Sequence, residues 1–146
     1  MGRLLVVALA VTVVAGCGGG SGAPRLSRTQ YAAKADAICR KYNRLSQAVA
    51  NPTSLAELAS AVKKITPLLD QSVRDLRKLR PPKDEGSIAD RWIDQIEAIR
   101  NDLADVGDKA ASKDTKGVQA ALRDGAKDQQ RGNQLAGRLG MTDCSE

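Results

Sequence analysis

The 146-residue sequence contains no histidine and no phenylalanine. Without histidine the chain lacks the commonest general base and metal ligand, which excludes Glu-x-x-His di-iron sites and haem attachment. The only aromatic residues are Tyr31, Tyr42 and Trp92, too few for a platform on which bases or sugars stack. A phosphate-binding loop of the Gly-x-x-x-x-Gly-Lys-Ser/Thr type is also missing. These absences predict a protein that is not an enzyme and holds no metal or cofactor.

The N-terminus has the parts of an export signal. Arg3 precedes an uninterrupted run of mostly apolar residues from Leu4 to Ala15. As a helix this run would rise about 18 Å, well short of the hydrocarbon core of about 30 Å, so it does not predict a transmembrane span. A basic start, a short apolar region and small residues at its end are typical of a secretory signal peptide.

The end of the apolar run is more specific, because Val14-Ala15-Gly16-Cys17 resembles the lipobox of bacterial lipoprotein signal peptides. In that family the cysteine thiol receives a diacylglyceryl group, and cleavage just before it leaves the acylated cysteine as the first residue. The resemblance implies a signal peptide over residues 1–16 and a lipid anchor at Cys17, on the extracytoplasmic face of the cell membrane. Residues 17–26, rich in glycine, then form the acylated cysteine and a flexible tether. Ordinary secretion after cleavage at the same small residues is the alternative.

Cysteine usage agrees with export. Three cysteines are an odd number for an exported chain, but lipidation of Cys17 leaves Cys39 and Cys144 as a pair. Outside the cytoplasm a disulfide between them would persist. It would close a loop of roughly 100 residues, worth up to about 4.7 kcal/mol on the chain-entropy model. We therefore expect a Cys39–Cys144 disulfide, with two unrelated buried thiols as the alternative.

Four segments of residues 27–146 have helical periodicity. The first begins at the possible capping box Ser27 to Gln30, and the second begins at Ser54. The second contains Pro67, which is expected to kink it. The apolar stripes predict these inward-facing side chains: Tyr31, Ala35, Ile38, Tyr42, Leu45 and Val49 in the first segment, and Leu55, Leu58, Val62, Ile65, Leu69, Leu76 and Leu79 in the second.

The third segment opens at Ser87 and the fourth is capped by Thr115, with Gly140 as a C-terminal stop. Four helices with short connections predict an all-α fold, an antiparallel up-down-up-down four-helix bundle over residues 27–146, preceded by the lipoprotein signal peptide. The stripes of these segments predict inward side chains at Ile88, Trp92, Ile96, Ile99, Leu103 and Val106, and at Val118, Leu122, Leu135 and Leu139.

Charge is unevenly distributed along the mature chain. The third segment is acidic and the second is basic, through Asp90, Asp94, Glu97, Asp102, Asp105 and Asp108 in the one and Lys63, Lys64, Arg74, Arg77, Lys78 and Arg80 in the other. This pattern favours complementarity between neighbouring helices. Attraction of the basic side to anionic lipid or cell-wall polymer beside the anchor is the alternative. The expected address argues against nucleic acid as a partner.

The fourth segment is small or polar where the other segments carry leucine. Its heptad continues through Gly125, Gln129 and Gly132, and each glycine costs about 1 kcal/mol relative to alanine in a helix. Close approach of this helix to Trp92 or another bulky neighbour is one explanation. The functional alternative is a ligand or partner groove built from Trp92, Gly125, Gln129 and Gly132.

Taken whole, the chain resembles small uncharacterised lipoproteins of high-GC Gram-positive bacteria. The residues that carry the resemblance are the lipobox, "YAAKADAICRKYN" around Cys39, "LRPP" from Leu79, Trp92 and "LAGRLGMTDC" ending at Cys144. The resemblance implies an envelope-anchored helical domain and no particular activity. We expect a non-catalytic interaction module for an envelope protein or a cell-wall component. A small-molecule binder that uses the bundle interior near the fourth helix is the alternative.

Overall fold

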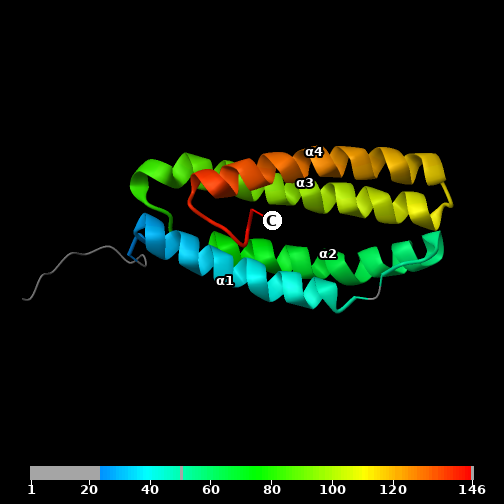
Figure 1. Cartoon of the computed structure of the whole chain (residues 1–146), viewed down its shortest axis with the longest axis horizontal. Helices are drawn as coiled ribbons and strands as arrows, with labels where there is room; N and C mark the ends of the chain where they lie inside the picture. Colours follow the sequence, from blue (N-terminus) through cyan, green and yellow to red (C-terminus); the bar gives the residue numbers. More distant parts are fainter. Residues whose placement is uncertain (1–23, 50, 146) are drawn as a thin grey trace, which may run out of the picture.

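A computed structural model describes residues 24–49 and 51–145. This part of the chain is all-helical, as predicted, with the elements α1 (Arg28–Gln47), α2 (Leu55–Arg77), the short 3-10 helix η1 (Lys83–Glu85), α3 (Gly86–Ala111) and α4 (Thr115–Arg138). The four α-helices run alternately up and down, and each packs on the next one along the chain (Figure 1). None of the described helices is both long enough and apolar enough to cross a bilayer. The expected signal peptide and most of the expected tether lie outside the described residues.

Helix starts follow the predicted capping residues at two of four positions. Ser27 and Gln30 form the expected capping box, and the Ser54 hydroxyl accepts a hydrogen bond from the Glu57 amide at 3.2 Å. The prediction of Thr115 as the cap of α4 is wrong, because the Asp114 carboxylate accepts from the Gly117 amide at 2.9 Å and Thr115 is the first helical residue. α3 begins at Gly86, directly after η1 and without a side-chain cap.

The core falls into two clusters along the bundle. The larger one contains the most completely buried side chains, Trp92, Tyr31, Leu76 and Leu139, and draws on all four helices. The smaller one comes from α2, α3 and α4 alone, through Ala59, Val62, Val106, Ala110, Val118 and Ala121. α1 lies alongside only part of the bundle (Figure 1), so the end that holds the α3–α4 turn is built from three helices.

Two predicted inward side chains are exposed instead. Leu122 of α4 is 52% exposed and Leu45 of α1 is 43% exposed. On α4 the neighbouring Ala121 is buried in the smaller cluster, so this helix is rotated slightly from the predicted heptad. Leu45 lies in the last turn of α1 and is not part of either cluster.

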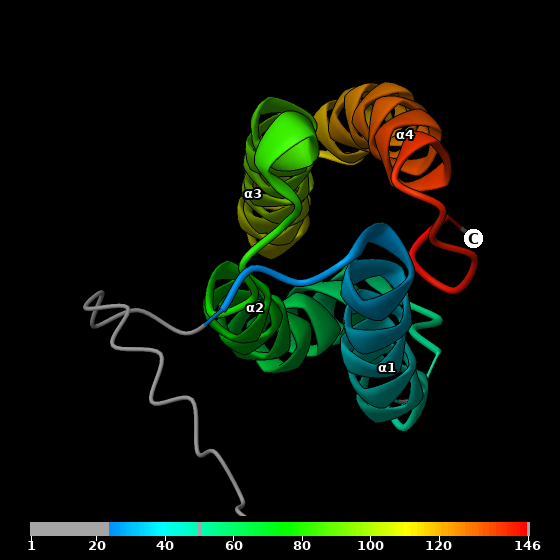
Figure 2. The same cartoon turned by 90° about the vertical axis from the view of Figure 1, so that its left-hand side faces the viewer.

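A C-terminal segment, residues 139–145, lies between α1 and α4 (Figure 2). It begins where α4 ends at the predicted stop, because Gly140 adopts a left-handed conformation with φ of +80°. The Met141 amide donates to the Ala136 carbonyl and the Gly140 amide to the Gly137 carbonyl, both at 3.0 Å, which is the Schellman arrangement. Met141 is then 2% exposed in the larger cluster.

The predicted disulfide is confirmed. Cys39 of α1 and Cys144 of the C-terminal segment are bonded, with their Cα atoms 5.4 Å apart and a sequence separation of 105. α1 packs chiefly on α2. The connection between α1 and the end of α4 is therefore made by the C-terminal segment and its disulfide.

Candidate functional site

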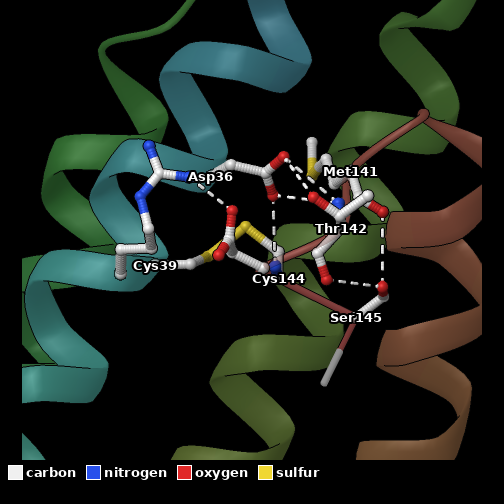
Figure 3. A network of polar contacts seen from close by, with 8 residues as sticks. Asp36, Cys39, Met141, Thr142, Cys144 and Ser145 are labelled. Atoms are coloured by element: carbon white, nitrogen blue, oxygen red, sulfur yellow. Dashed lines mark hydrogen bonds and ion pairs between the residues drawn. A yellow bond between two sulfur atoms is a disulfide. The ribbon is translucent and has the colours of Figure 1, made fainter.

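The C-terminal segment is held on α1 by a buried carboxylate. Asp36 is 7% exposed and accepts hydrogen bonds from the Thr142 amide at 3.1 Å and the Cys144 amide at 3.2 Å (Figure 3). The Thr142 hydroxyl donates to it at 3.3 Å, and Arg40 and Asp143 form an ion pair beside it. Every one of these contacts joins α1 to the C-terminal segment, so the network serves to close the bundle.

Two of the four residues of the predicted ligand or partner groove lie together at the surface. Gly125 and Gln129 line a shallow hollow between α3 and α4, which we call the α3–α4 hollow. Its volume is about 170 Å³, and its other lining residues are Ile99, Asp102, Leu103, Val106, Ala121, Leu122 and Ala126. Leu122 and Gln129 are exposed, so the hollow presents an apolar side chain and an amide to solvent on rigid helices.

The other two candidates lie in the packed interior. Trp92 is 1% exposed among the residues of the larger core cluster. Gly132 is buried, and a Cβ atom added there would lie 3.4 Å from Ile99 Cδ1 and 3.6 Å from Gln95 Cγ. These distances are ordinary van der Waals contacts, and an added Cβ at Gly125 would likewise lie 3.4 Å from Asp102 Cβ, so an alanine would fit at both positions and close packing requires glycine at neither.

Asp102 gives the α3–α4 hollow its electrostatic character. Its Oδ2 atom is buried and has no hydrogen-bond partner among the described residues. Burial raises the pKa of this carboxyl, and the nearby carboxylates of Asp128, Asp124 and Asp105 raise it further. Asp128 is paired with Arg131, Asp124 with Lys127 and Asp105 with Lys109, and Asp102 is the one acidic residue among the described residues that line the hollow.

The basic second helix and the acidic third helix pair with each other, as charge complementarity predicts. Arg77 contacts Glu97 at 2.7 Å and Asp94 at 3.7 Å, and Arg100 contacts Asp70 at 2.9 Å. The hollow of about 360 Å³ between these helices is lined by the same ion pairs. These contacts account for Arg77, Asp94 and Glu97 among the segregated charges, whereas Lys78 pairs with Asp75 of α2 and Asp105 with Lys109 of α3.

The structure shows two features that the sequence analysis did not predict. One is Gly107 of α3, where an added Cβ would lie only 2.7 Å from Val62 Cγ1 of α2. The other is Asp36, which lies four residues after Ala32 and three before Cys39, on the buried face of α1. An acidic residue inside an otherwise apolar stripe is the signal that could have revealed it.

No group of three or more His, Cys, Asp or Glu side chains is arranged to hold a metal ion within residues 24–49 and 51–145. No protein family, curated protein or solved structure matches the chain. The candidate site is therefore the α3–α4 hollow, identified by its geometry and charge.

Proposed function

We propose that the protein is a lipid-anchored lipoprotein on the extracytoplasmic face of the cell membrane, where it acts as a non-catalytic interaction module for another envelope component. The anchor is Cys17, at the end of the lipobox-like Val14 to Cys17. The Cys39–Cys144 disulfide supports an address outside the cytoplasm, where such bonds persist.

The observation that carries the interaction role is the contrast between a solid interior and an apolar hollow at the surface. Trp92, Tyr31, Leu76 and Leu139 fill the centre of the bundle to less than 2% exposure. Leu122, in contrast, stands 52% exposed beside the α3–α4 hollow. This arrangement supports a surface that receives a partner over the alternative of a small molecule bound inside the bundle.

The charge of the hollow narrows the class of partner. Asp102 lines it, and Asp105, Asp124 and Asp128 lie near enough to raise the pKa of Asp102. Asp105, Asp124 and Asp128 are each paired with a basic side chain of their own helix, so the charge that disfavours an anionic wall polymer comes from Asp102. A protein segment with an apolar side chain for the hollow and a neighbouring lysine or arginine for Asp102 satisfies both features, so we favour an envelope protein as the partner.

Site-specific photo-cross-linking in intact cells tests this role. A photoreactive residue at Leu122 or at Gln129 is expected to form the same discrete adduct, because both side chains border the α3–α4 hollow. Leu45 is the matched control, since it is also an exposed leucine but lies on α1. The adduct should disappear when Gly125→Arg fills the hollow. Equal labelling from Leu45 and Leu122 would contradict a specific surface.

The anchor has its own test. The mass of the intact protein extracted from membranes should correspond to a chain that begins at Cys17 and carries acyl groups, and Cys17→Ser should release the protein from the membrane fraction. A mature chain without acyl groups on Cys17 would contradict lipidation and leave the surface role untouched.

A further inference from the structure

The basic residues of the bundle are concentrated at one of its ends. We define the tether end as residues 24–34, 78–91 and 134–140, which contain the first turn of α1, the α2–α3 connection, the start of α3 and the end of α4. Figures 1 and 2 show these segments together at the end where the described chain begins. The tether end carries eight basic residues, Arg25, Arg28, Lys34, Lys78, Arg80, Lys83, Arg91 and Arg138, against three acidic ones, Asp84, Glu85 and Asp90.

The opposite end of the bundle is close to neutral. We define the far end as residues 51–58 and 106–123, the start of α2 and the α3–α4 turn. It has four basic residues, Lys109, Lys113, Lys116 and Arg123, against Glu57, Asp108 and Asp114. The excess positive charge of the mature chain therefore lies mainly where the expected lipid tether enters the bundle.

Hydrogen bonds and an ion pair fix the charged segments of the tether end to one another. The Leu26 amide donates to the Arg80 carbonyl at 2.9 Å, and Arg25 donates to the Pro81 carbonyl at 3.2 Å. Arg28 pairs with Glu85 at 3.1 Å and donates to the Arg138 carbonyl. The cationic surface is thus held on a rigid frame, with Lys34, Lys83 and Arg91 exposed on it.

We propose that the tether end docks on the surface of an anionic phospholipid bilayer. The long axis of the bundle is then roughly perpendicular to the membrane plane. This inference rests on the proposed anchor at Cys17. Residues 17–23 can reach at most about 25 Å, with a mean span of about 15 Å, which keeps the tether end near the headgroups. At physiological salt the attraction falls off over about 8 Å, so only the end nearest the anchor is drawn to the surface.

Docking in this orientation positions the α3–α4 hollow. Asp102 lies about 24 Å along α3 from Gly86, so the hollow would face the space beyond the headgroups. A bundle that lay flat on the bilayer would bring one long side to the lipid.

Lysine footprinting of the lipidated protein tests the docking directly. The acylated chain is reconstituted into vesicles of phosphatidylcholine alone or with about one third phosphatidylglycerol, and acetylation rates are read by mass spectrometry. Lys34 and Lys83 should react at least about fivefold more slowly on the anionic vesicles, because a basic residue near such a surface gains about 1 kcal/mol. Lys113 and Lys116 at the far end should be unaffected by lipid charge.

Two double variants with equal loss of charge provide the control. Lys83→Gln with Arg91→Gln should abolish most of the lipid-dependent protection of Lys34, whereas Lys116→Gln with Arg123→Gln should leave it. Equal protection at both ends, equal effects of the two variants, or protection of Lys34 by isolated wall polymer and not by anionic vesicles would each overturn the proposal. An unacylated chain can be footprinted on the same vesicles from solution. A failure of the docking proposal can therefore be distinguished from a failure of the lipidation proposal.

Discussion

Gly107 of α3 lies against Val62 of α2, with too little room for a Cβ atom. Its replacement by alanine should show how tightly the two helices pack at this point. An added Cβ would lie 2.7 Å from Val62 Cγ1 and 3.1 Å from Val62 Cβ. Ordinary contact begins near 3.4 Å, so α2 and α3 must separate or Val62 must shift by about 0.7 Å. Val62 is β-branched and 5% exposed in the smaller core cluster, which leaves it little freedom to move.

The expected net effect of Gly107→Ala is a loss of about 1 kcal/mol in the free energy of unfolding. Overpacking of a core costs about 1–3 kcal/mol, and the higher helix propensity of alanine returns about 1 kcal/mol. Urea unfolding followed by the fluorescence of the buried Trp92 measures the change. Gly137→Ala is the matched control, because nothing lies within 4 Å of its added Cβ, and it should be neutral or stabilising.

A second background makes the reasoning refutable. With Val62→Ala the obstructing methyl groups are absent, so Gly107→Ala should then stabilise the protein by up to about 1 kcal/mol. The two substitutions should therefore be non-additive, with a coupling energy of about 2 kcal/mol. Additive effects, or a stabilising Gly107→Ala in the wild-type background, would refute a tight contact at this position.

Three further substitutions test the buried polar groups. Asp36→Asn should cost about 2–3 kcal/mol in urea unfolding, because the amide cannot accept all the hydrogen bonds from Thr142 and Cys144, while the exposed control Asp108→Asn should change little. Tyr31→Phe should leave stability equal or higher at neutral pH, since the Tyr31 hydroxyl is buried without a partner among the described residues. Burial raises the pKa of Tyr31 to about 12, so the tyrosine ionises at lower pH in the unfolded state than in the folded state. Between pH 10 and 12 the wild type should therefore lose stability relative to Tyr31→Phe. Parallel curves of stability against pH for the two proteins would contradict this. Asp102→Asn should stabilise the protein at neutral pH, because burial raises the pKa of Asp102 and so disfavours its charged form in the folded state. This advantage should shrink in acid unfolding curves as the pH falls from the raised pKa of Asp102 to the usual aspartate value.

The fold was largely predictable because its signals are local. Ser27, Ser54 and Gly140 act on backbone groups within a few residues of themselves, so capping patterns locate them. The Cys39–Cys144 bond followed from cysteine number and the antiparallel topology. The orientation of α4 was harder, because a helix of glycine and alanine has a weak apolar stripe, and Leu122 was placed inside although it is exposed.

The candidate site was only partly predictable. Gly125 and Gln129 do line one hollow, but Trp92 and Gly132 belong to the packed interior. The heptad gives the face of a helix and not the depth at which its neighbour lies, so it could not separate these pairs. The partners of Asp36 are backbone amides more than 100 residues away in sequence. Such contacts depend on the tertiary arrangement. Their only sign in the sequence is an acidic residue on an otherwise apolar helix face.

Photo-cross-linking from Leu122 in living cells is the measurement that tests the proposed function most directly. The proposal predicts one discrete protein adduct, shared with Gln129, absent from Leu45 and lost when Gly125→Arg fills the α3–α4 hollow. The same adducts from Leu45 and Leu122, unaffected by Gly125→Arg, would contradict a partner surface on α3 and α4.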